Sequence, residues 1–144
     1  MKKFDYTSLL TLFKSPYELI LYKLRNESDQ LIPEYFNDSH FLVIFLVDRE
    51  FGSNQKQLAD KLYITKQSIG VIVDFLIKKK YLIKIKDPVD GRATLVKLAD
   101  KGWKLIEHSK SIINSITEQW NKKLGTKKIK KLIHLLLELN DNNK

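Results

Sequence analysis

The sequence contains no cysteine, and this absence removes several kinds of site at once. Without a thiol the chain can form no disulfide, no cysteine-ligated zinc site and no thiol redox sensor. The histidines are few and scattered, at His40, His108 and His134, and they match no metal-ligand spacing. We therefore expect neither a bound metal nor a cofactor.

Long apolar runs are missing as well. No stretch approaches the ~20 consecutive apolar residues that a membrane-spanning helix needs. The first six residues are not followed by an apolar segment of the signal-peptide type. We therefore expect a cytoplasmic protein with no membrane partner.

The residue patterns that enzymes commonly need are also lacking. The chain has no glycine-rich phosphate loop, no nucleophile beside a plausible base, and no pair of carboxylates in a recognisable frame. From these absences we expect a protein that is not an enzyme.

What the sequence does have is a strong excess of positive charge. Its 144 residues suit a single domain over 1–144, and 26 Lys and Arg against 17 Asp and Glu give a net charge of +9. Such an excess attracts polyanions, of which nucleic acid is the commonest inside cells. Plain solubility or affinity for a membrane surface would also explain this net positive charge, so charge alone leaves the partner open.

Hydrophobic periodicity and capping residues predict a mainly α-helical chain with one small β-hairpin. A serine, a proline and a glutamate within residues 15–18 predict a helix start there, and residues 7–14 then form a shorter arm. Thr126 is the expected cap of the last helix. The expected helices cover residues 15–25, 38–52, 55–62, 66–79, 100–123 and 127–139, and the expected strands cover 81–86 and 93–98.

The two helices at the centre of the chain have the pattern of a helix-turn-helix. In this motif apolar side chains at fixed offsets lock two steeply crossing helices. The residues that match are Leu58, Ala59, Leu62, Ile64, Ile69 and Ile72. Tyr63 stands in the turn, where we expect a positive φ that tyrosine adopts only reluctantly.

The exposed start of the second helix is the predicted DNA-reading segment. Gln67 can pair bidentately with adenine, and Lys66 can reach guanine or phosphate. Thr65 and Ser68 are expected to contact phosphates, and Val71 lies on or near the same face. The alternative is that these side chains only cap and solvate the helix end.

The predicted hairpin is basic. Ile83 and Ile85 alternate with Lys84 and Lys86, which predicts a half-buried strand with its isoleucines inward. Residues 66–92 hold seven basic and three acidic side chains. A basic hairpin beside a reading helix can lay its tip along the minor groove of DNA.

The hairpin tip carries the arginine suited to that groove, which is narrow and strongly negative. Arg92 follows Gly91, where the backbone can bend tightly. Asp90 is expected to hold the guanidinium in an extended rotamer. The alternative is a surface Asp–Arg pair worth at most about 1 kcal/mol.

The sequence resembles the MarR family of bacterial transcriptional regulators. The resemblance is carried by Gln57 to Leu62, by Thr65 to Ser68, by Asp87-Pro88-Val89-Asp90-Gly91-Arg92-Ala93, and by Leu98 followed by Gly102. It implies a winged helix-turn-helix over residues 38–98, flanked by dimerisation helices over 1–37 and 99–144. It further implies a homodimer, expected to be a repressor, with two recognition helices on a pseudo-palindrome of double-stranded DNA.

By the same resemblance, Asp90 and Arg92 match the wing of the family and residues 65–71 match its recognition segment. Members of the family often bind small phenolic or lipophilic molecules. A small-molecule effector of unknown identity is therefore a further expectation, without support from any particular residue.

The terminal helices carry a broad apolar surface that fits a dimer independently of the resemblance, since interleaved helices bury a core-like interface. The residues expected there are Tyr17, Ile20, Ile113, Ile116, Trp120, Ile129, Leu132, Ile133 and Leu136. The alternative is a helix packed between two elements of its own chain. Trp103, Trp120, Phe41 and Phe45 are expected in the core.

Two features leave alternatives open. Six lysines between Lys122 and Lys131 have no acidic residue among them, and a solvated helix face or a second contact with a polyanion would explain them. A winged helix can also use the same surface to bind another protein without specific DNA binding, and this interaction module is the main alternative to a regulator.

Overall fold

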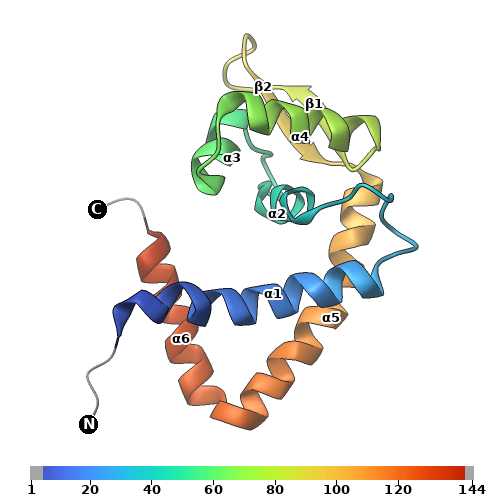
Figure 1. Ribbon diagram of the computed structural model, residues 1–144. Coiled ribbons are helices and arrows are strands. Elements are labelled where there is room, and N and C mark those ends of the chain that lie inside the picture. Colours follow the sequence, from blue (N-terminus) through green and yellow to red (C-terminus); the bar gives the residue numbers. More distant parts are fainter. Residues whose placement is uncertain (1–4, 142–144) are drawn as a thin grey trace. The chain divides into compact units, whose positions relative to one another are not determined.

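The computed structural model describes residues 5–141, which form two compact units. The central unit comprises Leu24–Ser109, and the terminal unit comprises the described residues up to Lys23 and from Lys110 onward. Two long helices, α1 (Leu9–Glu27) and α5 (Asp100–Leu124), each contribute to both units (Figure 1). The predicted functional division at residues 38 and 98 stays a prediction.

The central unit is a helix-turn-helix followed by a β-hairpin. Its elements are α2 (Asp38–Leu46), α3 (Gln55–Leu62), α4 (Lys66–Lys78), β1 (Leu82–Lys86) and β2 (Thr94–Leu98). The predicted fold class, mainly α with a winged helix-turn-helix, is confirmed. The predicted second helix is too long, because Val47 leaves the helical conformation and Asp48 accepts the N–H groups of Glu50 and Phe51 in a turn.

The crossing of α3 and α4 is locked largely as the sequence predicts. Leu58 and Ile69 are fully buried and Ala59 is buried, whereas Leu62, Ile64 and Ile72 are half-buried. Val73, which the pattern missed, is fully buried as well.

The turn between these helices has the positive φ predicted for Tyr63, at 55°. The Ile64 N–H donates to the Ala59 carbonyl across 3.1 Å, and the Tyr63 N–H donates to the Asp60 carbonyl across 3.3 Å. These bonds satisfy carbonyls at the end of α3, as in a Schellman motif. The phenol of Tyr63 lies in solvent.

The hairpin buries the face opposite to the predicted one. Leu82 pairs with Leu98 and Lys84 pairs with Val96 in the antiparallel register, and the three apolar residues of these pairs are buried. Ile83, on the other face, is 46% exposed. The sequence pattern predicts the alternation correctly but assigns the wrong face to the core. The core covers the face that carries Leu82, Val96 and Leu98.

Ser53 pairs with the hairpin through an isolated antiparallel β-bridge to Val96. Its N–H donates to the Val96 carbonyl across 2.9 Å, and its carbonyl accepts the Val96 N–H across 2.8 Å. The Ser53 hydroxyl also accepts the Asp48 N–H across 3.0 Å. These bonds attach the hairpin to the segment that leads into α3.

Tyr81 joins the hairpin to α5. Its carbonyl accepts the Ala99 N–H across 2.9 Å. Gly102 lies against the same carbonyl, since a Cβ at residue 102 would be 2.4 Å from that oxygen. The spacing of Leu98 and Gly102 therefore has a steric reason, since no larger residue fits at position 102.

In the terminal unit, α1 is one helix rather than a short arm followed by a helix from Ser15. A 3-10 helix (Tyr6–Ser8) precedes it, and the Asp5 carboxylate caps this turn by accepting the Thr7 N–H across 3.0 Å. Pro16 then lies inside α1, where a proline costs about 3 kcal/mol. The prediction of a helix start at Ser15 is wrong, because the helix already begins at Leu9 and continues through Pro16.

The last helix, α6 (Thr126–Asn140), follows α5 after a single residue. Gly125 occupies the capping position with a φ of 88°, and no side chain caps the helix. The predicted Thr126 cap is therefore wrong, because Thr126 already has a helical conformation as the first residue of α6.

Polar contacts hold the entry into α2. The guanidinium of Arg25, in the last turn of α1, pairs with the carboxylate of Asp38, in the first turn of α2. Asn37 and His40 form a capping box in which the His40 Nδ1 accepts the Asn37 N–H across 2.9 Å. The buried imidazole also stacks on Phe75 of α4, with ring centroids 4.3 Å apart.

Neither a membrane-spanning helix nor a cluster of metal-ligating side chains is present in the described part of the chain. Within residues 5–141, none of the helices combines the length and the apolar character that crossing a membrane requires. The same part of the chain brings no three potential metal-ligating side chains together. The first four residues, which enter the expectation about a signal segment, lie outside the described part.

Replacing Gly102 by alanine is expected to destabilise the central unit. Alanine improves helix propensity by about 1 kcal/mol, but a methyl group against the Tyr81 carbonyl costs about 1–3 kcal/mol or more. Chemical denaturation measures the difference. Gly91→Ala is the control, because nothing lies within 4 Å of a Cβ at residue 91. Equal stability of Gly102→Ala and wild type would contradict the close approach.

Acid is expected to destabilise the protein through His40. Burial lowers the pKa of His40 from its usual 6.5, so its neutral form contributes stability fully above that pH. This contribution is lost as the pH falls below 6.5 towards the pKa of the folded state. His40→Gln keeps an acceptor for the Asn37 N–H but does not titrate. Melting temperatures should therefore fall more steeply on acidification for wild type than for His40→Gln, and parallel curves would refute this role.

Candidate nucleic-acid interface

The start of α4 is a capped helix end. The Thr65 hydroxyl oxygen accepts the Ser68 N–H across 3.1 Å, and the hydroxyl donates to the Ser68 hydroxyl across 3.0 Å. Both side chains are exposed, but both already take part in the cap. The capping role that the sequence offered as an alternative is therefore present for these two residues.

Three further side chains of α4 have no such use. Lys66, Gln67 and Val71 are exposed, and no hydrogen bond or ion pair within residues 5–141 engages Lys66 or Gln67. Gln67 and Val71 are four residues apart and share one face of the helix. Val71 is 71% exposed, which is unusual for an apolar residue in a helix that buries Ile69, Val73 and Leu76 on its other side.

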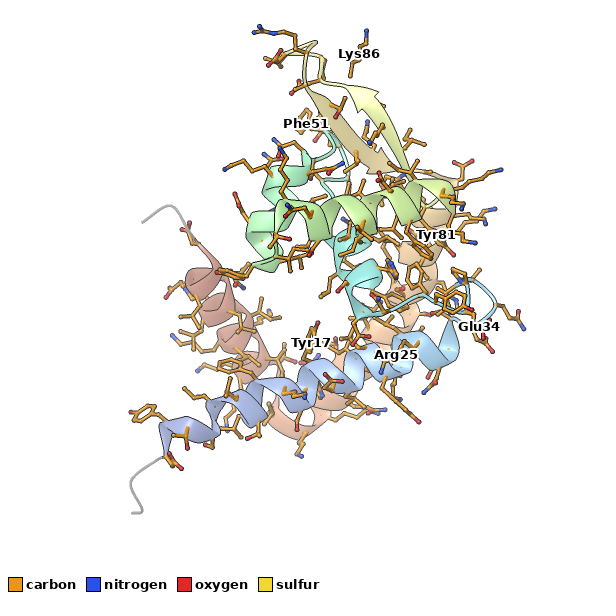
Figure 2. The ribbon with its side chains drawn as sticks, turned by 45° about the horizontal axis from the view of Figure 1, so that its top comes forward. Tyr17, Arg25, Glu34, Phe51, Tyr81 and Lys86 are labelled. Carbon is orange, nitrogen blue, oxygen red and sulfur yellow. The ribbon has the colours of Figure 1, made fainter. Side chains whose placement is uncertain are left out.

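The lysines of β1 differ in their surroundings. Lys84 lies on the strand face that carries Leu82, and its ammonium is 3.9 Å from the Asp74 carboxylate of α4. Lys86 lies at the outer end of the hairpin, whereas Tyr81 lies at its base (Figure 2). The structure thus places Lys86 near the tip and Lys84 beside α4.

The hairpin tip is held by its aspartates. The Asp87 carboxylate accepts the Val89 N–H across 2.9 Å, and the Asp90 carboxylate accepts the Arg92 N–H across 3.1 Å. The Arg92 guanidinium Nε is 3.6 Å from the same Asp90 oxygen, and its side chain is 96% exposed. Asp90 therefore fixes the backbone of the tip, and its ion pair with Arg92 is a loose surface contact.

Gly91 does not have the role expected of it. Its φ is not among the positive values of this backbone, and a side chain there would meet open space. The tight bend is produced by the Asp87 and Asp90 turns, because their carboxylates accept backbone N–H groups two residues on.

Sequence reasoning missed two residues of the tip. Asp87 organises the turn, and Val89 is 94% exposed at its outer end. The spacing of two aspartates around a proline could have indicated Asp87, since Asp side chains commonly accept N–H groups two residues later. No pattern in the sequence distinguishes Val89 from a core valine.

The residues predicted for dimerisation all lie in the terminal unit, but in different surroundings. Ile116 and Ile129 are buried within their own chain, whereas Tyr17, Leu132 and Ile133 are exposed. The others, Ile20, Ile113, Trp120 and Leu136, are half-buried. Trp103, in the central unit, is 40% exposed, so its predicted place in the core is wrong.

An apolar groove of about 810 Å³ runs along the terminal unit. Its walls come from α1, α5 and α6 and include Leu12, Phe13, Trp120, Leu132 and Leu136. Several leucines along this groove are exposed, so they form a large apolar patch. Large apolar patches on soluble proteins mark binding surfaces.

The chain is similar in sequence to known regulators. Residues 36–93 match the model of the MarR family. The HTH-type transcriptional regulator MhqR of Bacillus subtilis (strain 168) is 32% identical over 66 residues, which are 46% of this chain and 46% of MhqR. The chain thus matches about half the length of the curated relatives it resembles.

The fold extends this likeness over the whole chain. CouR of Rhodococcus jostii RHA1, bound to p-coumaroyl-CoA, superposes with a TM-score of 0.75 at 14% identity, covering 99% of each chain. CouR bound to a 23-mer DNA duplex gives 0.68 at 18% identity, covering 96% of this chain and 99% of CouR. A MarR family regulator of Rhodococcus sp. RHA1 gives 0.73 at 15% identity, covering 99% and 100%. Residues 36–93 thus resemble the MarR family in sequence, and the chain shares the fold of these solved structures along its length.

Proposed function

We propose that this protein is a transcriptional regulator that binds a pseudo-palindromic site in double-stranded DNA as a homodimer. In this proposal α4 lies in the major groove and the tip of the hairpin lies in the minor groove. Binding represses the gene concerned, as the description of CouR as a transcriptional repressor suggests for a protein of this fold.

The observation that carries the proposal is the outward face of α4. Gln67 and Val71 occupy one exposed face without serving the fold, next to a helix end that is already capped by Thr65. A glutamine can pair bidentately with adenine, and an apolar side chain can contact the methyl group of thymine. The two neighbouring side chains are thus suited to adjacent A·T pairs.

The other polar residues of this helix end have supporting roles. Lys66 is free to reach a guanine edge or a phosphate. Thr65 and Ser68 present hydroxyls at the helix start, where phosphates also bind backbone N–H groups. These contacts position α4 on the duplex without selecting its sequence.

The hairpin supplies the second contact. Arg92 is almost fully exposed, and the two tip aspartates fix the backbone that carries it. Arginine is favoured in a narrow minor groove because of the strong negative potential there. Lys86 is placed for a phosphate contact near the tip, and Lys84 contributes charge beside α4.

The homodimer in this proposal is formed through the apolar groove of the terminal unit. A stable dimer buries roughly 1,200 Å² or more, and obligate dimers bury a face that resembles a domain core. The groove, which Tyr17 helps to line, and the exposed Ile133 of α6 offer such a surface, which one chain leaves in contact with water. A second copy of the same groove and helices is the occupant we propose.

A small-molecule effector is a further part of the proposal. It is supported by CouR, whose structure contains p-coumaroyl-CoA. The residues of this chain do not indicate the chemistry of such a ligand.

Gln67→Ala is expected to relax the sequence preference at one position of each half-site. Loss of a bidentate contact costs about 1–3 kcal/mol of discrimination between bases. Binding to a set of singly substituted duplexes measures this, with Gln119→Ala on an exposed face of α5 as the matched control. An unchanged preference in Gln67→Ala would remove this residue from the reading face. Absence of any preference in wild type would favour a protein-interaction module instead.

Leu132→Asp is expected to dissociate the homodimer. The side chain is 43% exposed in the single chain, so a carboxylate there remains hydrated in the monomer but would be buried without a partner in the dimer. Analytical ultracentrifugation measures the mass, and Tyr35→Asp, at an exposed aromatic residue of the central unit, is the control. A folded Leu132→Asp protein that stays dimeric would show that the groove is not the interface.

A further inference from the structure

The turn between α5 and α6 carries the densest positive charge of the chain. We call this segment, residues 122–131, the basic tip. All six of its lysines are exposed, and the nearest acidic residues in sequence are Glu118 and Glu138. They are Lys122, Lys123, Lys127, Lys128, Lys130 and Lys131.

The lysines of the basic tip have no carboxylate partner in the part of the chain that is described. Other exposed lysines do have one, since Lys56 lies 3.3 Å from Asp60 and Lys84 lies 3.9 Å from Asp74. A solvated protein surface normally mixes both signs of charge. The basic tip is therefore unusual even within this basic protein.

The helices themselves do not account for this arrangement. Lys122 and Lys123 suit the last turn of α5, where cations are favourable. Lys127 and Lys128, however, lie in the first turn of α6, where a cation costs roughly 0.3–1 kcal/mol. An acidic residue would stabilise that turn, and no side chain caps it. The lysines thus reduce the stability of α6, which points to a partner outside the chain.

The geometry of α6 turns a row of lysines away from the core. Lys127, Lys130 and Lys131 are three and four residues apart, so they share one face of the helix. Ile129, on the opposite side, is buried in the terminal unit. These three lysines therefore present positive charge on one exposed face of α6, where an anion can approach.

The amino-acid composition of the basic tip favours binding to a phosphate backbone over binding to a lipid surface. Membrane-surface helices place large apolar or aromatic side chains beside their lysines for insertion. Between residues 122 and 131 only Leu124 and the buried Ile129 are large and apolar. Leu132 and Ile133, which follow in α6, are exposed in the single chain, but they belong to the surface that we propose the dimer covers. Lysine ammonium groups are point charges that bind phosphate without bidentate geometry.

We infer that the basic tip binds the phosphate backbone of duplex DNA without reading its sequence, as a site separate from α4 and the hairpin. The inference rests on the proposed function only in the choice of DNA as the polyanion. It predicts that this protein holds more DNA phosphates than its reading face alone can contact.

The test compares two matched double variants on a duplex of random sequence. Lys127→Gln/Lys130→Gln removes two charges from the tip, and Lys101→Gln/Lys104→Gln removes two exposed lysines at the same spacing from the start of α5. Fluorescence anisotropy across salt concentrations gives the slope of log affinity against log salt. The slope should become shallower by about 2 in the tip variant, because each phosphate contact contributes about 0.9, and it should not change in the control. Equal slopes for the tip variant and wild type would overturn the inference.

A third variant separates this inference from the proposed function. Lys66→Gln/Arg92→Gln weakens the reading face, and it should retain tip-dependent binding to the random duplex. Suppose that neither wild type nor any of these variants binds one DNA sequence more tightly than another, but the basic-tip variant still has the shallower slope. The site at the basic tip then stands, and the proposed function fails. If vesicles of phosphatidylcholine and phosphatidylserine bind wild type but not the tip variant, and the DNA slopes are equal, the tip is a membrane contact and the inference is overturned.

Discussion

The hydrogen bonds of Tyr81 hold the central unit together. Its N–H donates to the Leu76 carbonyl at the end of α4 across 2.8 Å, and its carbonyl accepts the Ala99 N–H at the start of α5 across 2.9 Å. Its hydroxyl donates to the Leu31 carbonyl in the loop between α1 and α2, and burial raises the pKa of this phenol. Gly102 completes the junction, because only a residue without a side chain can lie against the Tyr81 carbonyl. One residue thus ties the end of α4 to the start of α5 and to the loop between α1 and α2.

This constraint determines how α4 is presented. The chain enters α4 after Tyr63 and leaves it at Lys80, and both residues have a left-handed backbone, with φ of 55° and 68°. Such a conformation costs a non-glycine residue of order 1 kcal/mol and persists only where the surroundings determine it. Here the bonds from Ile64 to Ala59 and from Tyr81 to Leu76 do so. Hydrogen bonds therefore hold the backbone at both ends of α4, and such preorganisation reduces the entropy lost on association.

The sequence predicts those parts of the fold that local chemistry determines. Asn54 and Thr65 accept backbone N–H groups three residues on, so the starts of α3 and α4 follow from the sequence alone. The face of β1 and the passage of α1 through Pro16 depend on packing that no local pattern contains, and both predictions were wrong. In the proposed site the exposure of Gln67 and Arg92 agrees with the sequence. The hydrogen bond between the Thr65 and Ser68 hydroxyls, and the exposure of Val89 in the hairpin tip, required coordinates.

The central claim is that the exposed face of α4 and the hairpin tip together bind a specific DNA sequence. Its most direct test is fluorescence anisotropy of the wild-type protein with a duplex from upstream of its own gene and with a scrambled duplex of equal length. The account predicts tighter binding to the upstream duplex, with an affinity that falls steeply as salt rises. Absence of binding to either duplex at low salt would contradict it.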